Sequence, residues 1–131
     1  MKDLLCDGFQ ETVNECLVRH RSILDVLTKL QESTARVNRA VAKSVTSCGC
    51  IRISASRQRF PCDVCMESIK AHVGTHVDGE LCERCKDILE TEIGSLLFYL
   101  AALCNLLDLN LYDIMLKEQK KSALLGVYKL S

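Results

Sequence analysis

The feature that most constrains the fold is a regular apolar stripe between residues 89 and 107. Apolar side chains recur there at alternating steps of four and three residues: Leu89, Ile93, Leu96, Leu100, Leu103 and Leu107. This is the period of a helix packed lengthwise against other helices. Four neighbours widen the stripe: Leu97, Phe98, Tyr99 and Ala101. A helix that is apolar on nearly every side is either central in a bundle or shared between subunits.

Helical periodicity also covers both flanks of the chain, so the sequence predicts an all-α fold. The expected helices span about 2–19, 22–47, 79–107 and 111 onwards, and Ser22 is a suitable N-cap. We expect one domain, 1–131, built as a four- to five-helix bundle with two long central antiparallel helices. A cysteine-rich insertion, about 48–80, lies between them. Within it, "IRISAS" alternates like a short strand, and Pro61 could begin a short helix that ends near Gly74.

Charge and hydropathy exclude several classes of partner. Lysine plus arginine and aspartate plus glutamate number 17 each, with a pI near 6.8, so no global field favours nucleic acid or an anionic membrane. The longest uncharged apolar run, residues 96–104, is about half of the ~20 residues that span a bilayer. Asp3 and Asp7 interrupt the apolar region that a signal peptide would need. We therefore expect a cytoplasmic protein with neither a nucleic acid nor a membrane as its partner.

Nine cysteines are unusual in such a chain. In a reducing compartment, closely spaced cysteines are more often metal ligands or redox thiols than structural disulfides. Three of the nine lie among apolar residues in expected helices, where a thiol acts as a small hydrophobe: Cys6, Cys16 and Cys104. The other six form pairs: Cys48 with Cys50, Cys62 with Cys65, and Cys82 with Cys85.

The antiparallel arrangement brings two of these pairs together. The end of the second expected helix carries Cys48 and Cys50, and the start of the next long helix carries Cys82 and Cys85. Four thiolates from two short-spaced pairs suit tetrahedral zinc or an iron–sulfur cluster. We expect these four cysteines to bind a metal, with zinc as the first choice.

The third pair leaves three alternatives open. Cys62 and Cys65 could replace one of the other pairs, complete a second site with His72 and His76, or remain free thiols in an exposed loop. A lone histidine is more often solvated or hydrogen-bonded than bound to a metal, so His20 is not a candidate metal ligand.

Two segments carry a resemblance to a known family. "LTKLQESTARVNRAVAK", residues 27–43, and "ETEIGSLLFYLAALCNLLDLNLYDIM", residues 90–115, resemble the two motif helices of the MazG-like all-α nucleoside triphosphate pyrophosphohydrolases. The resemblance covers residues 27–43 and 89 to about 120, and leaves out the cysteine-rich insertion. It implies a helical bundle whose paired acidic helices hold magnesium against a nucleoside triphosphate, and assembly into dimers or tetramers.

The acidic motif is incomplete in this chain. The resemblance assigns the two retained catalytic carboxylates to Glu32 and Glu92. Ser33, Arg36 and Ser95 stand where the family has three more carboxylates. Hard divalent cations need several oxygen ligands, and a guanidinium one turn from Glu32 repels them. We expect an ion pair between Glu32 and Arg36, which lie one helical turn apart. Glu92 could accept a hydrogen bond from Arg36 across the two helices.

Other residues could in principle complete a differently built site: Glu11, Glu15 and Glu90 as ligands, and Arg52, Arg57 and Arg59 for a triphosphate. Exposed helix faces and loops carry such charges without a ligand more often. The sequence contains no glycine-rich phosphate loop and no catalytic triad signature.

Three functions follow. The first, which we favour, is a binding, structural or regulatory module with a degraded magnesium site and a cysteine-bound metal. The second is a working pyrophosphohydrolase with atypical ligands, which would use magnesium and a nucleotide. The third is a redox or metal sensor based on the paired cysteines. For each of them we expect a homo-oligomer, because an all-round apolar helix needs more cover than so small a chain provides.

Overall fold

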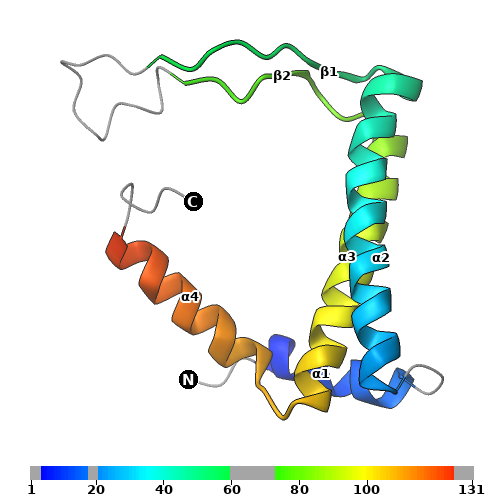
Figure 1. Cartoon of the computed structure of the whole chain (residues 1–131), viewed down its shortest axis with the longest axis vertical. Coiled ribbons are helices and arrows are strands. Elements are labelled where there is room, and N and C mark those ends of the chain that lie inside the picture. The colour runs from blue at the N-terminus through cyan, green and yellow to red at the C-terminus, as the bar shows by residue number, and fades with distance from the viewer. Residues whose placement is uncertain (1–3, 18–20, 60–72, 126–131) are drawn as a thin grey trace.

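The computed structural model of the 131-residue chain describes residues 4–17, 21–59 and 73–125. The elements in these ranges follow one another along the chain (Figure 1). They are α1 (Leu4–Cys16), α2 (Ile23–Lys43), a π-helical turn η1 (Ser44–Cys48), β1 (Ile51–Ile53), β2 (Val77–Gly79), α3 (Glu83–Leu106) and α4 (Leu111–Leu125). The all-α class is confirmed, since the strands that are described contain three residues each.

The long helices α2 and α3 lie side by side and run in opposite directions, as expected (Figure 1). Ser22 caps α2 as predicted, and its hydroxyl oxygen accepts a hydrogen bond from the Leu24 amide at 3.3 Å. The expected closed bundle is not confirmed. Helix α4 turns away from α3 at 109°, and none of its residues is buried.

The apolar core lies at one end of this helix pair, where α1 packs across it. Its fully buried members come from three helices and the residue after α1: Val13, Leu17, Val26, Ala101 and Ala102. Four half-buried side chains complete it: Phe98, Leu103, Leu106 and Leu111. Burial of apolar surface therefore stabilises this end of the pair.

A buried glutamine ties α1 to the turn between α3 and α4. The Gln10 side chain donates to the Leu109 carbonyl at 2.7 Å and accepts from the Leu111 amide at 2.9 Å. Asn105 donates to the Gln10 carbonyl at 2.9 Å. These partly buried bonds satisfy polar groups of the turn, and leaving them unpaired would destabilise the junction between α1 and the turn.

The other end of the pair carries a two-stranded ribbon. Strand β1 pairs with β2 in antiparallel register, with Ile51 opposite Gly79. The strand expected in "IRISAS" is thus confirmed for its first three residues, whereas β2 was not anticipated. Gly79 has φ of 90°, and a Cβ there would lie 2.6 Å from the Cys50 carbonyl oxygen. Only glycine lets the two strands approach this closely beside the cysteines. The short helix expected from Pro61 lies outside the described residues.

In the described part of the chain, no single helix has the length and apolar character to cross a membrane; only α3 and α4 taken together, as a bent pair, have them.

Candidate metal centre

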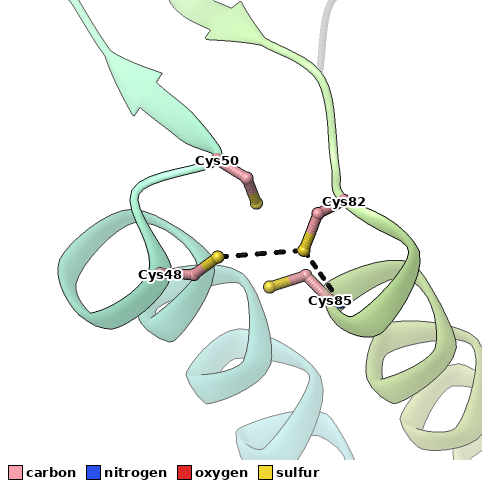
Figure 2. Close-up of side chains that lie close together, drawn as sticks. All are labelled: Cys48, Cys50, Cys82 and Cys85. Atoms are coloured by element: carbon pink, nitrogen blue, oxygen red, sulfur yellow. Dashed lines mark hydrogen bonds between the residues drawn. The ribbon is translucent and has the colours of Figure 1, made fainter.

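Four cysteines at the base of the ribbon, two before β1 and two after β2, converge on one point (Figure 2). The sulfur atoms of Cys48, Cys50, Cys82 and Cys85 all lie within 4.8 Å of one another. Cys48 ends η1 and Cys50 precedes β1, while Cys82 and Cys85 begin α3. These four residues are the predicted metal ligands, and the structure brings all of them together.

The backbone after α2 is shaped to turn both of its cysteines inward. The helix widens to a π-helical turn that ends at Cys48, and Gly49 follows with φ of 79°, a left-handed conformation that glycine adopts without strain. The Gly49 amide donates to the Ser44 carbonyl at 2.9 Å. The same carbonyl accepts from the Cys50 thiol at 3.8 Å. One buried carbonyl therefore organises the Cys48–Cys50 loop.

The other pair uses the start of α3. Cys82 is the N-cap, and its sulfur accepts a hydrogen bond from the Cys85 amide at 3.4 Å. The first amides and the dipole of a helix favour negative charge at this position. The Cys85 amide in particular lowers the pKa of Cys82 to about 7.

The thiols of Cys85 and Cys48 hold their protons more tightly. The Ser44 hydroxyl lowers the pKa of Cys85, but the neighbouring Cys82 thiol and burial outweigh it, so that this pKa rises to about 12. The Cys85 side chain lowers the pKa of Cys48, but the side chains of Cys82 and Cys50 together with burial outweigh it and leave this pKa raised. Near neutral pH the Cys82 thiol therefore ionises easily, whereas Cys48 and Cys85 need a cation to displace their protons.

Positive side chains surround one side of the cluster. A cavity of about 390 Å³ is lined by Arg39, Lys43 and Arg84 together with Cys48 and Cys85. None of these three cations is paired with a carboxylate in the described ranges. Four thiolates around a divalent ion carry a net charge of −2, and nearby cations stabilise such a centre.

The isolated cysteines behave differently from one another. Cys6 and Cys104 are buried, as expected for small hydrophobes, and burial raises the pKa of Cys104. The expectation was wrong for Cys16, which is exposed near the end of α1. Cys62, Cys65 and His72 lie outside the described residues. His76 is described, in a left-handed conformation just before β2, and is not part of the four-cysteine cluster.

The acidic positions form ion pairs. Arg36 contacts Glu32 at 3.3 Å and reaches across to Glu92 at 3.8 Å. Both expected pairs are therefore present. Lys29 adds a contact with Glu32 at 3.3 Å. Its hydrogen bond, followed by that of Arg36, lowers the pKa of Glu32.

The other residues considered for a magnesium site do not assemble one. Ser33 is only 3% exposed, so a glutamate in its place would not fit without rearrangement. Ser95 is half-buried, and three further acids are exposed on their helices: Glu11, Glu15 and Glu90. Arg52, Arg57 and Arg59 are exposed in and after β1. In the part of the chain that is described, the four cysteines are the single group of ligands placed to hold an ion.

Comparison with known proteins gives no match to any family model, to any curated protein or to any solved structure. The resemblance to the MazG-like family thus stays a prediction. The site residues that the sequence did not reveal are Ser44, Gly49 and Gly79. Glycine is a common turn residue, so the two glycines could have been noted in the insertion, whereas nothing marked Ser44 as the acceptor for the cysteine loop.

Proposed function

We propose that the chain is a helical module whose cysteine cluster binds one tetrahedral metal ion, zinc, in a structural role. The observation that carries this proposal is the convergence of four sulfurs within 4.8 Å. A tetrahedral ion with zinc–sulfur bonds of about 2.3 Å requires sulfurs about 3.8 Å apart, and the Cys48 and Cys82 sulfurs are separated by 3.8 Å. The other sulfurs lie within 4.8 Å of these and of each other, so shifts of about 1 Å would suffice to reach the same spacing.

The spacing also favours a single ion over an iron–sulfur cluster. In a cluster the cysteines bind different irons and so lie further apart than four sulfurs that share one ion. A single iron would fit the same tetrahedron, and its colour would distinguish it from colourless zinc.

A structural role follows from the number of ligands. Catalytic zinc keeps one position for water or substrate, whereas four protein thiolates fill all four positions. The ion would join the end of α2, the base of the ribbon and the start of α3. These three segments share few buried apolar side chains, chiefly Ile51 and Cys85. Metal–sulfur bonds would replace the missing core there.

We further propose that the two acidic positions of the MazG-like resemblance, Glu32 and Glu92, are the remnant of a magnesium site and do not bind magnesium. The support is the Arg36 guanidinium, which contacts both Glu32 and Glu92. A fixed cation on both retained carboxylates opposes a divalent ion. This proposal is tested by turnover of nucleoside triphosphates with magnesium or manganese. Pyrophosphate release that is lost in Glu92→Gln would refute it.

Metal content tests the cysteine centre directly. Protein purified anaerobically without chelators should contain one zinc per chain, and its cobalt(II) form should show the absorption of a tetrahedral thiolate site. Cys85→Ser should lose the ion. Cys16→Ser is the matched control, because Cys16 is an exposed thiol outside the cluster, and it should retain the ion. Metal-free protein, or equal metal content in both variants, would contradict the proposal.

A further inference from the structure

A groove between α2 and α3 begins beside the cysteine cluster. Its cavity of about 390 Å³ falls in the range of small-molecule sites, about 300–1,000 Å³. Arg36, Arg39 and Lys43 line the α2 wall at steps of three and four residues, so they share one face of the helix. Ile88 is 45% exposed on the α3 wall and gives the groove an apolar side. The groove thus combines a row of cations with an apolar surface.

Two of these cations have no carboxylate beside them. Arg36 contacts Glu92, the one carboxylate among the described residues that line the groove, at 3.8 Å. No ion pair in the described ranges involves Arg39 or Lys43. Like charges three or four residues apart on a helix destabilise it. An anion between Arg39 and Lys43 would relieve this repulsion.

The metal centre does not account for Arg39. This exposed residue precedes Cys48 by nine positions, which is about 13 Å along a helix. Helical Cβ atoms also point toward the N-terminus, here away from the cluster. The distance exceeds the Debye length, about 8 Å at physiological ionic strength, so the charge of the centre is largely screened from Arg39. Arg84 is next to Cys85 in the chain and is better placed to balance that charge, which leaves Arg39 for a ligand.

We propose that the groove binds a phosphate monoester, with its phosphoryl group between Arg39 and Lys43 and its apolar body against Ile88. The phosphoryl group of a monoester carries a charge of about −1.5 to −2 at pH 7, which two cations balance, whereas a monocarboxylate leaves one cation unpaired. The planar guanidinium binds two phosphate oxygens at once, and the ammonium adds a point charge. Side chains supply all of this positive charge, so the site needs no magnesium. It differs in this respect from the magnesium-held triphosphate that the family resemblance implies.

Isothermal titration of the full chain as purified tests the site, with phenyl phosphate as the probe. The wild type should bind one phenyl phosphate per chain. Inorganic phosphate lacks the apolar body and should bind about 10-fold more weakly. Arg39→Gln should weaken phenyl phosphate binding at least about 10-fold, because it removes charge-assisted hydrogen bonds. Arg52→Gln is the matched control: Arg52 is exposed on β1 outside the groove, and this variant should bind like the wild type.

A second variant separates the two parts of the ligand. Ile88→Ala should lower the affinity for phenyl phosphate to that for inorganic phosphate, and should leave the affinity for inorganic phosphate unchanged. Both groove variants should keep wild-type helicity, because Arg39 and Ile88 are exposed. A wild type that binds no phenyl phosphate at millimolar concentration would overturn the proposal. So would equal affinity in Arg39→Gln and the wild type, or binding that requires magnesium.

Discussion

The two ends of the α2–α3 pair are held together in different ways. At the α1 end, apolar side chains such as Val13, Val26 and Ala102 are fully buried, and Gln10 bonds across the turn. At the ribbon end, the buried residues are Ser44, Ile51 and Cys85, with four cysteine sulfurs between them. The first end is held by its own side chains, whereas we propose that a bound ion closes the second. On this proposal, the ion replaces buried apolar side chains, of which the described residues supply few at the ribbon end.

Removing the metal should produce the largest difference between the two ends. A chelator should open the ribbon end, because the thiols lose the ion that joins η1 to α3. Hydrogen exchange should accelerate in 44–53 and 77–88 and change little around Val13 and Ala102. The free energy of unfolding should fall by about 3 kcal/mol or more, which lowers the Tm by roughly 10 °C. Cys16→Ser should melt like the wild type, and uniform loss of protection along the chain would contradict the two-ended description.

Low pH should weaken metal binding and so destabilise the ribbon end, but not the α1 end. The pKa of Cys82 is about 7 and that of Cys85 about 12 without metal, so binding an ion releases protons and is opposed by low pH. Zinc affinity should fall on the order of a thousandfold for each pH unit below neutral. Stability that the metal supplies is therefore greatest at alkaline pH and lost as pH falls. Calorimetric titrations between pH 6 and 8 measure this, and Cys85→Ser, which lacks the site, should show no such dependence.

Sequence patterns predicted the two ends unequally. The long antiparallel helices and the meeting of Cys48, Cys50, Cys82 and Cys85 followed from apolar periodicity and cysteine spacing, which are local signals. Strand β2 did not, because it depends on the close approach of Gly79 to the Cys50 carbonyl across the ribbon. The π-helical turn did not either, because no residue pattern marked the Ser44 carbonyl as the acceptor for the Gly49 amide and the Cys50 thiol. The outward course of α4 was also missed, since helical period alone gives no direction after a turn.

The α1 end should respond to loss of hydrogen bonds rather than to metal. Gln10→Leu keeps a side chain of similar volume but leaves the Leu109 carbonyl and the Leu111 amide without their hydrogen-bond partner. Burying such groups unpaired costs about 2 kcal/mol. Thermal melts should show this loss in both the metal-bound and the chelated protein. Zinc content should be unchanged, and a Gln10→Leu protein that loses zinc would show that the two ends are coupled.

The ion pairs of Arg36, which lie part-way along α2 and α3, should contribute least to the free energy of unfolding. Measuring that contribution distinguishes a residual salt bridge from a preserved metal site. The Arg36 side chain is 60% exposed and that of Glu92 is 20% exposed, at 3.8 Å, so solvent screens their attraction. A double-mutant cycle with Arg36→Gln and Glu92→Gln should give a coupling energy below about 1 kcal/mol that shrinks further in high salt. If Glu92 instead served a magnesium ion, Arg36→Gln would remove a repelling cation, and the protein would gain stability on addition of magnesium. We expect no such gain, because two carboxylates without further oxygen ligands are a poor site for a hard cation.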